Sequence, residues 1–117
     1  PEMLKRINSA GSKWGLEMGI IAHIGDGNIH PIPIKPEGMS PERWAVYSEE
    51  FFEELIKEAI SLGGVGSGEH GVGHVKQHII IQSKSPAELE LLRGIKRSFD
   101  PLNILNPGKM FFPLENQ

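Results

Sequence analysis

The stretch Ala22–His30, with the sequence AHIGDGNIH, predicts a β-hairpin and so constrains the rest of the fold. Its centre, Asp26-Gly27, is a strong two-residue turn signal because glycine accepts a positive φ and aspartate tolerates one. A turn centred there places His23 directly opposite His30. Residues opposite each other in an antiparallel pair share a face of the sheet, with Cβ atoms about 4.5–5.5 Å apart. The hairpin therefore predicts two imidazoles that face each other across the strands.

Alternating residues on both sides of this turn predict the two strands. Residues 16–24 alternate with period two, and their even-numbered side chains, all apolar, should face the core. His23 then lies on the opposite face of the sheet. Residues 28–34 form the partner strand, in which Pro31 and Pro33 have no N–H to donate. We therefore expect an edge strand, or one that leaves the sheet early.

Three helices are predicted around and after the hairpin. The first covers Glu2–Trp14, and the second runs from the N-cap Ser40 to about Leu62. The third begins at the capping box Ser85–Glu88 and ends before Asp100-Pro101. The second helix carries an apolar stripe at spacings of three and four, formed by Trp44, Tyr47, Phe51, Leu55, Ala59 and Leu62. Helices packed against a small antiparallel sheet give an α+β fold.

Length and composition exclude several classes of protein. The 117 residues are expected to form one domain, residues 1–117, with 38% hydrophobic and 23% charged residues. The net charge of −3 and the lack of a basic cluster argue against nucleic acid as a partner. There is no cysteine, so no disulfide forms, and no apolar run approaches the roughly 18 residues of a membrane span. We expect a cytoplasmic protein.

The two ends of the chain indicate a piece of something longer. Pro1-Glu2 already reads as the first turn of a helix, although removal of an initiator methionine before proline is the alternative. Near the other end, Met110, Phe111 and Phe112 are too apolar to remain uncovered. We expect the sheet face or something outside this chain to cover them, and the chain on its own to self-associate as a homo-oligomer.

The glycine-rich stretch Gly66–Gly73, GSGEHGVG, formally matches the dinucleotide-binding pattern G-x-G-x-x-G. That pattern carries its meaning only after a strand and before a helix. Here a long predicted helix precedes it, and Glu69 would put a carboxylate where the pyrophosphate must approach. We therefore reject a dinucleotide site and interpret the glycines as allowing close approach of the backbone to whatever binds.

Three histidines, His70, His74 and His78, follow at spacings of four. On a continuous helix they would share a face, and a pair at this spacing can bind zinc. Gly71 and Gly73 favour the other interpretation, in which the helix is broken and the last two histidines lie on the surface. The stretch from residue 72 to residue 81 is compatible with either helix or extended chain.

His23, His30 and Glu69 together form a candidate metal site. Each alone would more often have a structural role, but the facing pair and a carboxylate on a glycine loop make a combined role credible. Two imidazoles and one carboxylate suit Zn²⁺, Mn²⁺ or Fe²⁺, and the residues do not choose among these metals. His70, next to Glu69, is a natural general base because imidazole titrates near neutral pH.

Three motifs in this order resemble a known family. They are HIGDGNIH at residues 23–30, SGEHGVG at residues 67–73 and FDPLNILNPGKMF at residues 99–111. They are similar to the C-terminal domain of FAD-linked oxidases of the glycolate oxidase, D-lactate dehydrogenase and D-2-hydroxyglutarate dehydrogenase type, in the vanillyl-alcohol-oxidase superfamily. The resemblance covers essentially the whole chain, and three ordered motifs are more specific than any one.

The resemblance implies a ferredoxin-like cap domain whose antiparallel sheet has helices on one face and the flavin on the other. FAD would be bound mainly by an N-terminal domain that this sequence does not contain. His23, His30 and Glu69 would hold a divalent metal that orients a 2-hydroxy acid. His70 would take the hydroxyl proton while hydride leaves C2 for the flavin.

The resemblance also implies roles for other residues. Asn28 would contact the substrate or support the site, and Asn106 and Lys109 belong to a tail that runs towards the FAD-binding domain. The sequence departs from the family at Ile32, where some relatives carry a polar residue, and at His74, where an apolar residue is commoner.

These observations predict the C-terminal part of a flavin-dependent enzyme that oxidises a small D-2-hydroxy acid to a 2-oxo acid. Its partners would be the substrate and an FAD-binding domain, in the parent chain or in a partner subunit. The chain alone should be inactive because it lacks the hydride acceptor. A free-standing metal-binding or interaction module is the alternative, and a scaffold whose histidines no longer function is a third.

Overall fold

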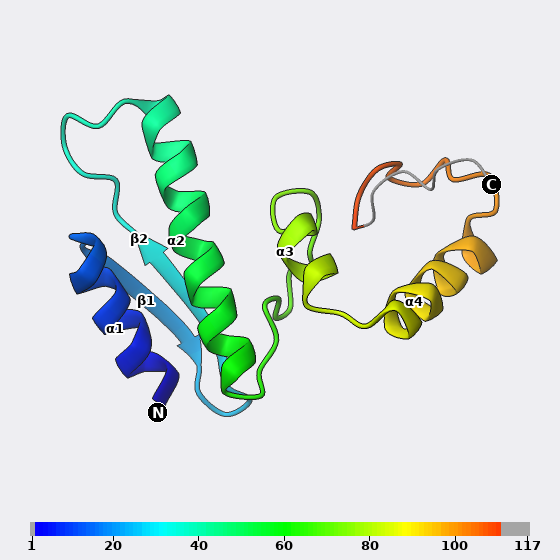
Figure 1. Ribbon diagram of the computed structural model, residues 1–117, viewed down its shortest axis with the longest axis horizontal. Coiled ribbons are helices and arrows are strands. Elements are labelled where there is room, and N and C mark those ends of the chain that lie inside the picture. The colour runs from blue at the N-terminus through cyan, green and yellow to red at the C-terminus, as the bar shows by residue number, and fades with distance from the viewer. Residues whose placement is uncertain (1, 111–117) are drawn as a thin grey trace. The chain divides into compact units, whose positions relative to one another are not determined.

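A computed structural model describes residues 2–110, apart from the side chains of residues 79, 80 and 82. The chain divides into two compact units, residues 1–69 and residues 70–117. The first contains α1 (Glu2–Trp14), β1 (Met18–His23), β2 (Asn28–Pro33) and α2 (Pro41–Ser61), and the second contains α3 (Gln77–Gln82) and α4 (Pro86–Phe99) (Figure 1). Not one of the described helices is both long and apolar enough to cross a membrane.

In the first unit, α1 and α2 pack on one face of the β1–β2 hairpin (Figure 1). The α+β class with helices on one face of the sheet is thereby confirmed. The order helix, strand, strand, helix is that of the inner four elements of a β-α-β-β-α-β ferredoxin-like unit. The other face of the hairpin carries the side chains of His23 and His30.

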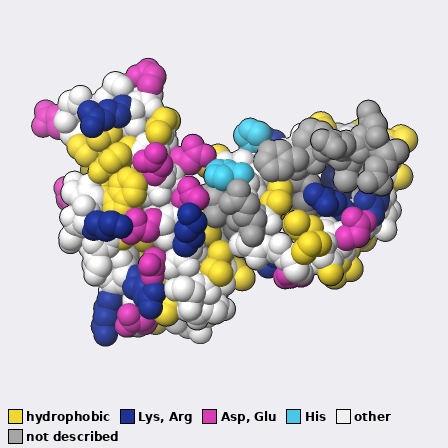
Figure 2. All heavy atoms as spheres, in the orientation of Figure 1, with side chains coloured by type: hydrophobic (Ala, Val, Ile, Leu, Met, Phe, Trp, Pro, Cys, Tyr) yellow, Lys and Arg dark blue, Asp and Glu magenta, His cyan; other side chains and the backbone are white. Residues whose placement is uncertain are grey.

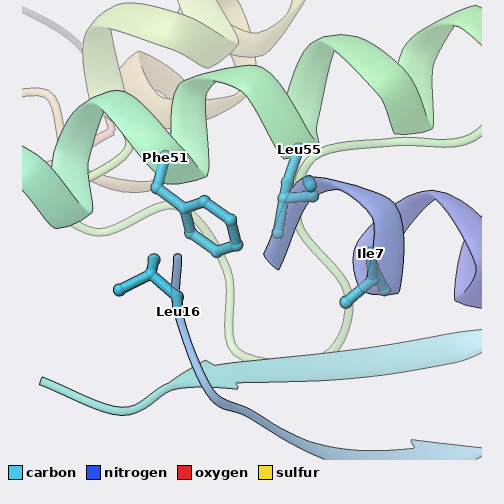
Figure 3. Close-up of a cluster of buried hydrophobic side chains, with 5 residues drawn as sticks. Ile7, Leu16, Phe51 and Leu55 are labelled. Carbon is cyan, nitrogen blue, oxygen red and sulfur yellow. The ribbon is translucent and has the colours of Figure 1, made fainter. Parts of the chain in front are cut away.

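The core of the first unit lies between its two helices and the even-numbered face of β1 (Figure 3). Phe51 from α2 and Ile7 from α1 are 0% and 1% exposed. Leu16, just before β1, is buried beside them, as the alternation predicted. The prediction was wrong for Ile24, which is 77% exposed because it lies in the loop beyond the end of β1.

Local signals account for the ends of the helices. The Ser40 hydroxyl accepts a hydrogen bond from the N–H of Arg43 at 3.3 Å, and Pro41 follows as the first residue of α2. α1 ends before Gly15, whose φ of 64° is the left-handed conformation that glycine adopts readily after a helix. These local preferences explain why the predicted bounds agree with the structure.

The register of the hairpin differs from the prediction. His23 pairs with Asn28, and His30 pairs with Ile21, so the predicted His23–His30 pairing was wrong by two residues. The cause lies in the turn, where Asp26 accepts a hydrogen bond from the N–H of Asn28 at 3.0 Å and the loop spans residues 24–27 instead of two residues. A slip of one residue would have put the histidines on opposite faces, whereas a slip of two keeps them together.

β2 is an edge strand among the described residues, as its prolines predicted. The N–H of Ile34 donates to the carbonyl of Glu17 at 2.8 Å. The backbone N–H groups of the even-numbered residues in this segment therefore point towards β1. Pro31 and Pro33 therefore occupy positions whose missing N–H would point away from β1, and the ladder loses nothing there.

In the second unit, α4 carries the predicted capping box. The Ser85 hydroxyl accepts from the N–H of Glu88, and the Glu88 carboxylate accepts from the N–H of Ser85 at 2.9 Å. Asp100 caps the end of α4, and its buried carboxylate accepts from the N–H groups of Ile104 and Leu105 and from Lys96. The hydrogen bond from Lys96 is the main cause that holds the pKa of the Asp100 carboxyl below its usual value.

The segment before α4 resolves the open question about residues 72–81. Helix α3 begins only at Gln77, and Gly71 and Gly73 have φ values of 72° and 58°. No continuous helix therefore joins the three histidines of this segment. The N–H of Met110 donates to the Gly73 carbonyl at 2.8 Å, while Phe111 and Phe112 lie outside the described residues.

Candidate metal centre

The hairpin places two imidazoles on the face of the sheet away from the core. The ring centroids of His23 and His30 lie 5.7 Å apart, with an angle of 81° between the ring planes. The two residues are diagonal neighbours across the strands, because the partner of His23 is Asn28 and that of His30 is Ile21. Diagonal neighbours on one face remain within reach of long or aromatic side chains.

Glu69 completes the cluster from the glycine-rich loop. Its Oε2 lies 3.7 Å from Nε2 of His23, and its Oε1 lies 3.5 Å from Nε2 of His30. One ligand atom from each of the three residues lies within 4.8 Å of the other two. The sequence prediction that these three side chains lie together therefore agrees with the structure.

The loop reaches the hairpin because α2 ends in a glycine reversal. The N–H of Leu62 donates to the carbonyls of Glu58 and Ala59, and Gly63 follows with a φ of 79°. The N–H of Gly64 then donates to the Ala59 carbonyl at 2.9 Å. This C-terminal cap stops the helix and turns the chain towards the histidines.

The three side chains fit a divalent cation. Tetrahedral bonds of about 2.0–2.2 Å put neighbouring ligand atoms roughly 3.4 Å apart, close to the two carboxylate–imidazole distances. The His23 and Glu69 side chains are 58% and 51% exposed, so water or a substrate could occupy further coordination positions. Among the described residues, this is the one group of His, Asp or Glu side chains with such spacing.

The other predicted site residues are distributed over both units. Asn28, half-buried, lies directly opposite His23 on the same face. His70 is exposed and begins the second unit, directly after Glu69 in the chain. Asn106 and Lys109 are exposed in a turn of the second unit, where the N–H of Lys109 donates to the Asn106 carbonyl at 3.2 Å.

Sequence reasoning missed the contact between Gly68 and Asn28. A Cβ atom built on Gly68 would lie only 2.2 Å from Oδ1 of Asn28. The signal that could have revealed it is a glycine directly before the candidate ligand Glu69, in a loop that already has glycines for its turns.

Comparisons with known proteins agree with the motifs. The family model described as "FAD linked oxidases, C-terminal domain" matches residues 1–110. A D-lactate dehydrogenase of Archaeoglobus fulgidus is 44% identical over 109 residues, which cover 93% of this chain and 23% of that protein. The glycolate oxidase subunit GlcD of Bacillus subtilis is 38% identical, with the same coverage.

A third relative is a D-2-hydroxyglutarate dehydrogenase of Stutzerimonas stutzeri, 37% identical over 95% of this chain and 24% of that protein. The chain thus spans about a quarter of the length of these relatives. The match to the family model extends over nearly all of the chain and includes His23, His30 and Glu69. This chain belongs to the family of FAD-linked oxidase C-terminal domains.

Proposed function

We propose that this chain provides the metal- and substrate-binding part of a flavin-dependent dehydrogenase or oxidase that converts a small D-2-hydroxy acid to a 2-oxo acid. The observation that carries the proposal is the convergence of His23, His30 and Glu69 on one open face of the hairpin. The names of the three relatives support the substrate class, because lactate, glycolate and 2-hydroxyglutarate are all 2-hydroxy acids.

In this proposal the two neutral imidazoles and the carboxylate hold one divalent cation, with Zn²⁺, Mn²⁺ and Fe²⁺ as candidates. A bound cation would supply positive charge that attracts the hydroxyl and carboxylate oxygens of the acid. The exposure of the cluster leaves room for an acid to approach, and Glu69 offsets one of the two positive charges of the cation.

His70 is the proposed general base. Its imidazole accepts the proton of the substrate hydroxyl, while the C2–H bond breaks with its electron pair and the C–O bond gains double-bond character. FAD, when bound, supplies the acceptor for that hydride. The proton and the hydride leave one molecule of acid together, so the product is the 2-oxo acid.

Asn28, Asn106 and Lys109 have supporting roles in the proposal. Asn28 lies on the face of the hairpin that carries His23 and His30, where it can contact the acid or support the metal ligands. Asn106 and Lys109 lie in the exposed turn near the end of the described chain, and we propose that they face the FAD-binding domain. That domain belongs to the parent chain or to a partner subunit.

A second candidate is a metal-binding module without redox activity of its own. It is favoured by the fact that all three ligands belong to the first unit, so that metal binding needs no flavin and no second unit.

Metal titration tests the shared part of both candidates. The metal-free chain, titrated with Zn²⁺ or Mn²⁺ in a calorimeter, should bind one equivalent, and His23→Ala and Glu69→Gln should each weaken binding at least tenfold. His74→Ala and Glu37→Gln are matched controls, because both side chains are exposed and lie outside the cluster. Equal uptake by all five proteins would refute the site.

The catalytic part requires a protein that also contains the FAD-binding domain. With D-lactate and an artificial electron acceptor, His70→Asn should lower kcat about 10²–10⁴-fold with little change in metal content, as expected for loss of a general base. His74→Ala again serves as the control. Full activity of the His70→Asn variant would contradict the role of His70, and metal binding without any turnover by the wild type would favour the second candidate.

A further inference from the structure

Gly68 lacks a side chain for reasons of space. A Cβ atom at this position would lie 2.2 Å from Oδ1, 2.9 Å from Cγ and 3.2 Å from Nδ2 of Asn28. These three atoms are the nearest neighbours, and all belong to one side chain. The φ of Gly68 is not in the left-handed region, so the backbone conformation does not require glycine.

The backbone of Asn28 is held on the hairpin, and its side chain lies on the face that carries His23 and His30. Its N–H donates to Oδ1 of Asp26 at 3.0 Å, and its strand partner is His23. Because side chains alternate along a strand, Asn28 and His30 share a face. The amide of Asn28 therefore stands beside both imidazoles, where the loop that carries Glu69 passes.

We propose that only glycine at position 68 fits beside the side chain of Asn28, and that the missing side chain lets the loop of residues 66–69 approach the hairpin closely enough to position the carboxylate of Glu69 between the two imidazoles. The inference rests on the proposed metal site and deepens it, by naming the pair that aligns the third ligand with the first two. Gly68 and Asn28 are positioning residues in this account, and neither is a metal ligand.

Distances show why such a contact matters. Real Cβ atoms do not approach a heavy atom more closely than about 3.0 Å, so with alanine at position 68 either the side chain of Asn28 rotates away or position 68 moves back by about 0.8 Å. Metal–ligand distances tolerate only about 0.2 Å. We propose that the loop gives way, and since Glu69 is the next residue, its carboxylate then moves away from the two imidazoles that it now lies 3.7 and 3.5 Å from.

The alternative is that Asn28 acts through its polar atoms, as a ligand or a hydrogen-bond partner of the bound species. The two accounts differ in what a second substitution does. If the contact is steric, removing the Asn28 side chain should make alanine at position 68 tolerable. If Asn28 acts through its polar atoms, the Asn28→Ala substitution should be harmful and should restore nothing.

The test is a double-mutant cycle with Co²⁺ alone as the probe, followed by its visible absorption. We expect Gly68→Ala to weaken Co²⁺ binding at least tenfold in the Asn28 background and less than threefold in the Asn28→Ala background. In the Asn28→Leu background, which keeps the bulk without the polar atoms, Gly68→Ala should again weaken Co²⁺ binding at least tenfold. An equal loss from Gly68→Ala in both backgrounds, or no loss in either, would overturn the proposal.

Gly25→Ala is the matched control. Gly25 lies in the hairpin loop of residues 24–27, its φ is not in the left-handed region, and a Cβ there would meet no atom within 4 Å. This variant should bind Co²⁺ as the wild type does. A loss as large as that of Gly68→Ala would show that any added methyl group near the hairpin is harmful, which would also count against the proposal.

A second measurement needs no metal. In the metal-free chain, nuclear Overhauser contacts should join the side-chain amide of Asn28 to the α protons of Gly68, and the ring of His30 to the Glu69 side chain. Gly68→Ala should abolish the His30–Glu69 contact, and the double variant should restore it. If this contact persists in Gly68→Ala, the positioning role is wrong even if the wild type binds metal. If the wild type binds no metal but the contacts behave as expected, the proposed function fails and the positioning role stands.

Discussion

At the scale of single residues, Glu54 shows how one side chain ties two helices together. Lys13 Nζ and Trp14 Nε1 at the end of α1 donate to its carboxylate at 2.8 and 2.9 Å. The hydroxyl of Tyr47 donates to the Trp14 carbonyl at 2.6 Å and strengthens the same junction. The hydrogen bonds from Lys13 and then Trp14 hold the pKa of the Glu54 carboxyl below its usual value.

A pH dependence follows from the lowered pKa of Glu54. Because the folded state favours the charged carboxylate, its contribution is fully present above the unfolded pKa of about 4.3 and is lost as the pH falls through the folded value. Glu54→Gln should therefore lower the free energy of unfolding by about 0.5–1 kcal/mol at pH 7. The difference from the wild type should shrink towards the acid end of a series of urea titrations between pH 7 and pH 3.

The control for this prediction is Glu50→Gln, an exposed carboxylate on the same helix. A difference between wild type and Glu54→Gln that stays constant over the whole pH range would contradict the electrostatic account. It would indicate that Gln fails for reasons of packing.

Several carboxylates of the first unit are paired with a basic side chain. On the face seen in Figure 2, acidic and basic side chains lie interspersed. Lys57 donates to Glu53 at 2.8 Å within α2, and Arg6 of α1 donates to Glu58. Such exposed pairs each contribute little, typically 0–1 kcal/mol, so the face reads as a solvated surface and not as a site.

At the scale of elements, two glycines inside helices have opposite surroundings. A Cβ on Gly94 in α4 would meet no atom within 4 Å, apart from the helix's own backbone. A Cβ on Gly11 in α1 would lie 2.5 Å from Cγ of Met18 and 3.3 Å from the carbonyl oxygen of Leu16. Glycine weakens any helix through its conformational freedom, but only at Gly11 does its small size admit a neighbouring strand.

The two helices should therefore respond differently to the same change. Gly94→Ala should raise the free energy of unfolding by about 0.5–1 kcal/mol, because alanine has the higher helix propensity and nothing obstructs it. Gly11→Ala should lower it by about 1–3 kcal/mol, because Met18 must leave its place in the core. Thermal unfolding followed by circular dichroism measures both, and each variant is the control for the other. Changes of the same sign would show that the packing of α1 on β1 does not explain Gly11.

At the scale of the whole molecule, a metal should couple the hairpin to the loop that follows α2. A ligand that binds only the folded state stabilises it by about 2.7 kcal/mol at a hundred times its dissociation constant. Zn²⁺ should therefore raise the unfolding temperature of the wild-type chain, and a chelator should reverse the rise. Glu69→Gln should show little of this effect. An identical rise in both proteins would mean that the metal binds elsewhere.

Exposed apolar side chains in the second unit lead to a prediction about assembly. Leu91, Ile95 and Phe99 of α4 are 66%, 49% and 83% exposed, and Leu102 after the helix is 78% exposed. Because water disfavours such a stripe, the chain on its own should self-associate, with an apparent mass above 12.9 kDa by light scattering. Phe99→Ser combined with Leu91→Ser should reduce the mass towards that of a monomer. A wild-type chain that stays monomeric at high concentration would contradict this prediction.

The sequence by itself determined the elements of this protein and the face on which the histidines lie. Helix bounds followed from Ser40, the Ser85–Glu88 capping box and Gly15, because caps and glycine reversals act over a few residues. The shared face of His23 and His30 followed from the period of a strand, which is why an error of two residues in the register did no harm. The motifs sufficed to place the chain in its family.

Only the tertiary structure decided the register, the convergence of Glu69 with the two imidazoles, and the Asn28–Gly68 contact. The register depends on a hydrogen bond from Asn28 to Asp26 that competes with the two-residue turn. The other two depend on how α2 packs across the hairpin and where its end releases the chain. The contacts of Glu69 and Gly68 with the hairpin join segments far apart in the sequence, and no local preference for turn, strand or helix specifies such contacts.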